Sequence, residues 1–387
     1  MMQKYIPLST PNLKGKELEY VTNAVKSEWV STGGPYVNDF ENNLAEYVRT
    51  KGAVSCQNGT AGLHIALKVC GITKDEEVIV PTLTFIAAVN PVKYLGAEPV
   101  FMDCDDSLTI DTIKLLQFCE EECVFIDRKL INKKTNRLIT AIIVVHVFGN
   151  MADMEKIMPI AEKYNLKVIE DATEALGTYY TEGKYAGKYA GTIGNVGVYS
   201  FNGNKIITCG GGGMIVSDDE KILRKAKHLT TQAKIDEIYF IHDDIGYNYR
   251  MTNLQAALGL AQLEQLEQFI RIKQDNYILY KNEIKKITGL KILDFKKGIR
   301  PNYWFYALYC DEEYKLNRDE IINYLSSKNV QARPIWGLIN EQKPYIDCQS
   351  HEIVKAKVYL QHVVNIPCGS NLNENDVRYV VNCLLQV

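Results

Sequence analysis

A carboxylate and an amine that could act together follow two apolar stretches of this sequence. Asp171 ends the stretch 168–171, and Lys205 comes shortly after the stretch 197–201. Both stretches are short and rich in Val, Ile or Phe, as buried strands are. The carboxyl ends of parallel strands meet at one edge of a sheet, in the crevice where α/β proteins bind ligands. We therefore expect the Asp171 and Lys205 side chains to converge.

This pair matches the needs of pyridoxal phosphate. The cofactor is an electron sink only while its ring nitrogen stays protonated, and a carboxylate such as Asp171 beside that nitrogen favours the cationic form. The aldehyde must be held by an amine that later moves protons, a task suited to Lys205. Taken singly, each residue has a plainer explanation: Asp171 as a helix cap and Lys205 as a surface lysine.

A third sequence element, after Asp171 and Lys205, supports a binding site for pyridoxal phosphate. The segment 57–63 reads as a strand that runs into a glycine turn and then a helix, which aims free backbone amides and the positive helix end at a phosphate. Such a turn is common on its own, so it is evidence for a phosphate site only in combination with Asp171 and Lys205. We expect the phosphate ligands to come from Gly59, Thr60, Ala61 and the hydroxyl of Ser200. Phe85 follows another strand and could stack on the ring, although packing in the core remains an alternative.

Composition excludes several other classes of function. The 44 basic and 47 acidic residues give a net charge of -3, without the basic stripe that nucleic acid binding requires. Ten cysteines lack paired spacing, and the six histidines lack an i, i+4 pair, so no metal site is expected. The N-terminus lacks an apolar signal core, and no apolar run approaches the roughly 18 residues of a membrane span. We expect a cytoplasmic protein.

The order of the elements predicts an α/β fold with a mostly parallel sheet flanked by helices. We expect a large domain over residues 1–265, including an N-terminal segment, and a smaller α/β domain over 266–387. Helices are expected to start at Thr60, Ile86, Ala152 and Glu220, and to span Leu254–Ile284 and Arg318–Asn329. The expected strands are Ala53–Gln57, Glu77–Val80, Pro99–Asp103, Thr140–His146, Lys167–Asp171, Gly197–Phe201 and Gly213–Ser217.

With these segments, and with 29–34 and 246–257, the chain resembles the DegT/DnrJ family of sugar aminotransferases over nearly its full length. The resemblance implies a fold-type I pyridoxal-phosphate transferase in which Asp171 pairs with the ring nitrogen and Phe85 stacks on the ring. It implies that Gly59, Thr60, Ala61 and Ser200 hold the phosphate. It also implies a homodimer, because Asn248 would reach the phosphate of the neighbouring subunit. Relatives that remove a sugar hydroxyl carry histidine at the lysine position, so Lys205 favours amine transfer.

Within the family, residues 200–213 read SFNGNKIITCGGGG and resemble the C4 aminotransferases of the legionaminic-acid and bacillosamine pathways. This implies transfer of an amino group from L-glutamate to C4 of a UDP- or GDP-linked 4-keto-6-deoxy-N-acetylhexosamine. The 4-amino sugar nucleotide would serve a surface glycan or a nonulosonate. The alternatives are another 3- or 4-keto deoxysugar nucleotide, as in perosamine synthesis, and a catalytically idle homologue that binds the cofactor.

The sequence departs from the family's pattern at Gly211, where many relatives carry Glu, at Thr173, where alanine is usual, and at Glu174, where Gln or His is usual. A carboxylate beside the cofactor's phenolate-like oxygen is repulsive unless a proton is shared, so we expect Glu174 to share one.

Arginines suit the diphosphate of a nucleotide sugar because of their planar fork. The candidates are Arg250 and Arg333, each of which has a structural ion pair as the alternative. His146 follows a strand near the expected site, where a plain structural role is equally open.

Overall fold

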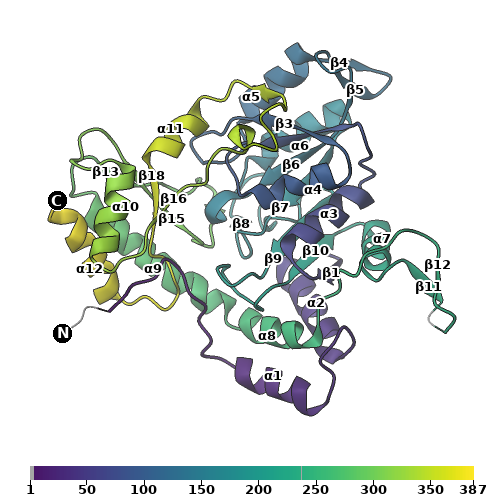
Figure 1. Ribbon diagram of the computed structural model, residues 1–387, viewed down its shortest axis with the longest axis horizontal. Coiled ribbons are helices and arrows are strands. Elements are labelled where there is room, and N and C mark those ends of the chain that lie inside the picture. Colours follow the sequence, from purple (N-terminus) through teal and green to yellow (C-terminus); the bar gives the residue numbers. More distant parts are fainter. Residues whose placement is uncertain (1–3, 237) are drawn as a thin grey trace.

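The computed structural model describes residues 4–236 and 238–387 and contains one large and one smaller sheet (Figure 1). The large sheet has ten strands in the order β1-β10-β9-β7-β6-β2-β3-β17, and β5 and β4 extend it beside β6. Its strands are β1 Gly52–Cys56, β2 Glu77–Pro81, β3 Glu98–Met102, β4 Cys123–Ile126, β5 Lys129–Asn132, β6 Leu138–Val145, β7 Lys167–Asp171, β9 Val196–Ser200, β10 Gly213–Ser217 and β17 Ser350–His351.

The centre of the large sheet is parallel. Strands β3, β2, β6, β7 and β9 run in one direction, while β10, between β9 and β1, and β5, beside β6, run in the opposite direction. The central strands are almost continuously buried, because parallel sheets are covered on both faces. Helices α2, α3, α6 and α7 pack against it. The predicted α/β class is confirmed, and every predicted strand is present.

The helices agree with the sequence in most places. They are α1 Glu17–Lys26, α2 Pro35–Val48, α3 Gly59–Val69, α4 Asn90–Tyr94, α5 Thr112–Gln117, α6 Met154–Tyr164, α7 Glu220–Thr230, α8 Asn253–Leu263, α9 Leu266–Ile284, α10 Arg318–Ser327, α11 Lys355–His362 and α12 Glu374–Leu385. The helix predicted from Ile86 is wrong in its first turn: residues Ile86–Ala88 form a 3₁₀ turn, and α4 starts only before Pro91. Proline fits the first turn of a helix because it has no N–H to place there.

The predicted helix Leu254–Ile284 is two helices, α8 and α9, which meet at Gln265. The backbone N–H of Gln265 bonds three residues back, to the Gln262 carbonyl, and the Gln265 side chain takes the Ala261 carbonyl instead. That side chain also donates to the Glu17 carboxylate at 2.6 Å. The helix therefore tightens and breaks at this point, because a side chain has replaced one of its backbone bonds.

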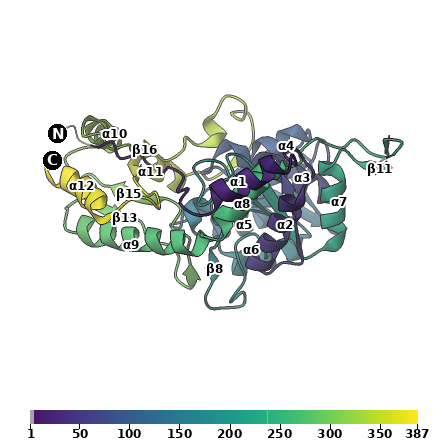
Figure 2. The same cartoon turned by 90° about the horizontal axis from the view of Figure 1, so that it is seen from below.

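The smaller sheet is antiparallel, in the order β13-β15-β18-β16, and all its strands come from the C-terminal part of the chain. Several contacts cross the predicted domain boundary at residue 265. Among them, β17 joins the large sheet beside β3, β14 pairs with β8, and Ile6 bridges to Val330. Figure 2 shows the two parts side by side, with α9 running beneath the smaller one. The strands are β13 Leu290–Ile292, β15 Tyr306–Cys310, β16 Arg333–Pro334 and β18 Val363–Ile366; two short pairs are β8 Tyr179–Tyr180 with β14 Ile299–Arg300, and β11 Lys234–Asp236 with β12 Ile241–His242.

Within the described residues, no helix is both long and apolar enough to cross a membrane. The same residues contain no group of three His, Cys, Asp or Glu side chains placed to hold a metal ion.

Candidate active site

A cavity of about 310 Å³ lies at the carboxyl edge of the large sheet. Asp171 ends β7 and Ser200 ends β9, so both side chains reach this edge, and the turn after β1 reaches it as well. The topology thus brings together residues that are far apart in the sequence. The cavity is lined by Asn58, Gly59, Thr60, Leu63, Thr84, Phe85, Ala87, Ala88, Asp171, Thr173, Glu174, Ser200, Asn202, Asn204, Lys205, Trp304 and Trp336.

Asp171 is a buried carboxylate with little protein around it to offset its charge. Its Oδ1 accepts one backbone hydrogen bond, from Thr173 N at 3.1 Å. Burial raises the pKa of Asp171, and the contacts with Thr173 and Lys205 offset this only in part. A cationic ring nitrogen would supply the missing partner, because an opposite charge favours the ionised form.

Lys205 and Glu174 face each other across the cavity. The Lys205 Nζ lies 3.9 Å from Oε1 of Glu174 and 4.4 Å from the ring centroid of Trp304. Burial lowers the pKa of the Lys205 amine, and the two nearby carboxylates offset only part of that effect. Burial also raises the pKa of Glu174 to about 7, although Lys205 and the Phe148 N–H oppose the rise. Both shifts favour a neutral pair, and a neutral amine can attack a carbonyl carbon or accept a proton.

The start of α3 forms a cradle for an anion. Asn58 caps the helix by accepting a hydrogen bond from Ala61 N at 2.8 Å, so that the Ala61 amide is already used. The Gly59 and Thr60 amides lie in the first turn, where backbone donors have no partner within the helix. A Cβ atom at Gly59 would lie 2.9 Å from the Ser200 Cβ, so only glycine leaves this space open. The cradle therefore fits a phosphate group, with the Ser200 hydroxyl beside it.

Seven of the predicted site residues line the cavity, and five do not. Phe85 lines it and is 54 % exposed as a residue, which leaves the ring free to contact a ligand rather than the core. Ala61 lies just behind the cradle. Asn248 and Arg333 are exposed elsewhere on the chain, and Arg250 lines a different cavity.

His146 lies behind the site, where it is fully buried. Its Nε2 donates to Glu170 Oε2 at 2.9 Å, because its Nδ1 accepts from the Ala152 N–H at 3.2 Å. Burial opposes ionisation of Glu170, but the bonds from His146 and from the backbone amides of Gly191 and Gly194 outweigh it and lower the pKa of Glu170. The structure thus places His146 in a buried pair that anchors the loop near residues 191–194.

The site also contains residues that the sequence did not reveal. Trp304 and Trp336 line the cavity, and the Trp304 indole N–H donates to the Asn204 carbonyl at 2.8 Å, next to Lys205. Asn302 is fully buried and donates to the carbonyls of Glu174 and Leu176, at 2.9 Å each. We call residues 302–304 the strap, because this segment holds the backbone beside both Lys205 and Glu174. No local pattern marked it, since its partners lie about a hundred or more positions away.

Comparison with known proteins gives related enzymes over the whole chain. The GDP-perosamine synthase of Escherichia coli O157:H7 is 38% identical over 97% of each chain. The putative pyridoxal phosphate-dependent aminotransferase EpsN of Bacillus subtilis is 35% identical, over 100% of this chain and 96% of its own. A UDP-4-amino-4,6-dideoxy-N-acetyl-beta-L-altrosamine transaminase of Campylobacter jejuni is 29% identical, over 99% of this chain and 97% of its own.

Solved structures show the same fold. A DegT DnrJ EryC1 StrS aminotransferase from Brucella abortus superimposes with a TM-score of 0.86 and 25% identity, over 96% of this chain and 95% of its own. The Helicobacter pylori aminotransferase PseC superimposes with a TM-score of 0.88 and 22% identity, over 99% of each chain. The model of the DegT/DnrJ/EryC1/StrS aminotransferase family matches residues 11–385. The chain, with its facing lysine and carboxylates beside a phosphate cradle, therefore belongs to this family and is a pyridoxal-phosphate-dependent aminotransferase.

Proposed function

We propose that this chain transfers the amino group of L-glutamate to C4 of a UDP- or GDP-linked 4-keto-6-deoxy sugar, an N-acetylhexosamine in the first instance. The product would be a 4-amino sugar nucleotide for a surface glycan or a nonulosonate. The observation that carries this proposal is the single cavity that joins Lys205 and Asp171 with the Gly59 cradle.

The residues of the cavity fit pyridoxal phosphate. When bound, the cofactor supplies an electron sink that stabilises negative charge on the carbon losing a proton. Asp171 would hold positive charge on the ring nitrogen, and the Gly59 and Thr60 amides with the Ser200 hydroxyl would hold the phosphate. Phe85 would cover one face of the ring.

Lys205 would hold the cofactor's carbonyl carbon at rest and move a proton once the substrate amine has displaced it. Its lowered pKa supports this, since only the neutral amine can accept a proton. Glu174, at 3.9 Å from the amine, would share a proton with the cofactor's ring oxygen. The raised pKa of Glu174 makes that proton available near neutral pH.

The sugar would contact the outer part of the cavity. Trp304 and Trp336 also line the cavity, and their rings would suit the apolar face and 6-methyl group of a deoxy sugar. The names of the relatives support a nucleotide carrier, UDP in one case and GDP in another. The GDP-perosamine synthases, at 34 to 38% identity, favour a GDP-linked sugar of the perosamine type as the second candidate.

A homodimer with shared sites completes the proposal. Asn248 is exposed outside the cavity of its own chain, as expected if it reaches a neighbouring subunit. The preceding hairpin, β11 and β12, projects from the body (Figures 1 and 2), and large exposed apolar patches mark interaction sites. The exposed apolar side chains of this hairpin and its flanks are Ile235, Ile238, Tyr239, Phe240, Ile241 and Ile245.

The test is a panel of UDP- and GDP-linked 4-keto-6-deoxy sugars, with and without the N-acetyl group, incubated with ¹⁵N-labelled L-glutamate. We expect 2-oxoglutarate release and label at C4 with one carrier, and neither product with Lys205→Ala. Label at C3 would overturn the proposed position. Cofactor binding without label transfer to any sugar would instead indicate a catalytically idle homologue.

A further inference from the structure

Strand β4 forms an open edge of the large sheet. In the described part of the chain it pairs only with β5, which in turn pairs with the first residues of β6. A two-residue turn at Asp127 and Arg128 joins β4 to β5. Figure 1 shows this hairpin at the top of the molecule, apart from the hairpin of β11 and β12. We call residues 123–126 the β4 edge.

The β4 edge is apolar and accessible to another strand. Val124, Phe125 and Ile126 follow one another in the sequence, and each is between 43 and 55 % exposed. Open edge strands are normally protected by a charged side chain, a proline or a β-bulge. The β4 edge has neither a charged residue nor a proline, and its register with β5 is unbroken. It can therefore accept a further strand.

The backbone of the β4 edge limits how such a strand can pair. The pair that closes a two-residue hairpin, here Ile126 with Lys129, is hydrogen-bonded, and hydrogen-bonded pairs then alternate along the strands. The bond from the Lys133 N–H to the Glu122 carbonyl, at 2.9 Å, follows this alternation. The N–H and C=O of Phe125 therefore point away from β5. Among the described residues, neither group has a partner.

We propose that the β4 edge pairs with the β4 edge of a second copy of this chain, antiparallel and about a two-fold axis at Phe125. Two strands join only when outward-facing backbone groups meet, and this register places Phe125 opposite Phe125 of the second copy. Each of the two residues then donates its N–H to the carbonyl of the other. A two-fold interface of this kind uses one self-complementary surface twice.

The charges at the two ends of the β4 edge support a second copy as the partner. Glu122 precedes the edge and Arg128 follows it, and neither forms an ion pair within the described residues. Pairing about Phe125 brings Glu122 beside Arg128 of the second copy, and symmetry repeats this contact. The next register towards the start of β4 that the backbone allows would instead bring Glu121 beside Asp127, which is repulsive.

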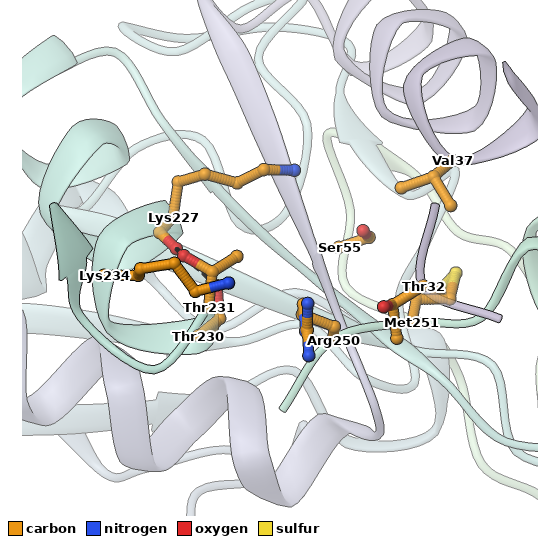
Figure 3. Close-up of a pocket in the computed structure, with 9 residues that line it drawn as sticks. All are labelled: Thr32, Val37, Ser55, Lys227, Thr230, Thr231, Lys234, Arg250 and Met251. Atoms are coloured by element: carbon orange, nitrogen blue, oxygen red, sulfur yellow. Dashed lines mark hydrogen bonds between the residues drawn. The ribbon is translucent and has the colours of Figure 1, made fainter. Parts of the chain in front are cut away.

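The β4 edge is separate from the reacting site. The hairpin lies beside the start of β6, at Leu138 and Ile139, whereas the site lies at the carboxyl edge of the sheet. No residue of 120–129 lines the Lys205 cavity or the cavity around Lys227 and Arg250 that Figure 3 shows. Loss of the pairing should therefore leave turnover unchanged, and the pairing can be tested whatever the sugar substrate is.

The first test is sedimentation velocity of the pyridoxal-phosphate-loaded protein over a range of concentrations. Because β4 has only four residues, the interface is small, and association should rise with concentration. Phe125→Arg places two like charges opposite each other on the axis, so the dissociation constant of the pairing should rise about tenfold or more. Ile113→Arg changes an apolar residue of α5 that is also exposed, and should sediment as the wild type does.

A cysteine introduced at the axis tests the register. In a hydrogen-bonded antiparallel pair the two Cα atoms lie about 5.5 Å apart, a distance that a disulfide spans. Phe125→Cys should therefore form a two-chain band under oxidising, non-reducing conditions. Val124→Cys is the control, because it faces Ile126 of the second copy and lies about 7 Å or more from its own counterpart. The ten natural cysteines are buried or half-buried and should not link the copies.

A charge exchange tests the partner. Glu122→Arg and Arg128→Asp should each weaken the pairing, and the double variant should restore it. Unchanged melting temperature and cofactor absorbance would show that each variant is folded. The proposal is overturned if Phe125→Arg sediments as the wild type does, if Ile113→Arg dissociates as much, if Val124→Cys links the copies as readily as Phe125→Cys, or if the double variant stays dissociated, as a different partner for β4 would require.

Discussion

The buried carboxyl group of Glu174 should make the stability of the cofactor-free protein depend on pH in a way that one substitution removes. Burial raises the pKa of Glu174 from its ordinary value near 4.5 to about 7. Between these two values the folded chain keeps a proton that the unfolded chain has released. This contribution to the free energy of unfolding is therefore complete below pH 4.5 and is lost as the pH rises to 7.

The size of the effect follows from the change in pKa. A rise from 4.5 to about 7 is about a 300-fold change in the proton equilibrium, or about 3 kcal/mol. Because Glu174 is buried, solvent screens this contribution little. Glu174→Gln keeps an oxygen that can accept from the Phe148 N–H but cannot ionise, so it should remove the dependence while preserving the local contact.

The assay is urea unfolding of the cofactor-free protein at pH values from 4.5 to 7.5 and at one protein concentration. The unfolding free energy of the wild type should fall relative to Glu174→Gln by about 3 kcal/mol across the range. Glu312→Gln, which changes an exposed glutamate, serves as the control and should run parallel to the wild type. Parallel curves for the wild type and Glu174→Gln would refute the reasoning.

Three further substitutions probe the site. Lys205→Ala should abolish both turnover and the visible absorbance band of the bound cofactor, and retention of either would contradict the role of the amine. Gly59→Ala places a Cβ atom 2.9 Å from the Ser200 Cβ, so the cofactor dissociation constant in an absorbance titration should rise about tenfold or more, while an unchanged constant would argue against the cradle. Trp304→Phe removes the bond to the Asn204 carbonyl; unfolding should become easier by about 1 kcal/mol and kcat should fall more than KM changes, whereas an effect on KM alone would count against a positioning role.

The sequence predicted the sheet and the centre of the site well because both have local signatures. Strands β7 and β9 carry short apolar runs; Asp171 ends the first and Lys205 follows the second, so both could be placed at one edge. The start of α3 was predicted from the glycine turn and lies within one residue of its expected position. The local sequence determines where these strands end and where this helix starts, so both can be predicted before any tertiary contact is known.

The missed features depend on tertiary contacts. The break between α8 and α9 arises from the contact of Gln265 with Glu17, which lies 248 positions away. Asn302 and Trp304 become site residues only because the chain returns to the large sheet after α9. His146 follows a strand as a site residue would, yet its partner Glu170 lies on the far side of β7 from Asp171, because side chains alternate along a strand. No periodicity in the sequence reports these contacts.

The strap has a consequence for the order of events during synthesis. Asn204 and Trp304 are 100 positions apart, so the backbone beside Lys205 lacks its indole partner until most of the protein has left the ribosome. A nascent chain that ends near α9 can form the cofactor cradle from α3 but cannot yet brace Lys205 or Glu174. Full assembly of the site thus requires the C-terminal third of the polypeptide. A chain that terminates early in that region would contain Lys205 without the contacts of the strap.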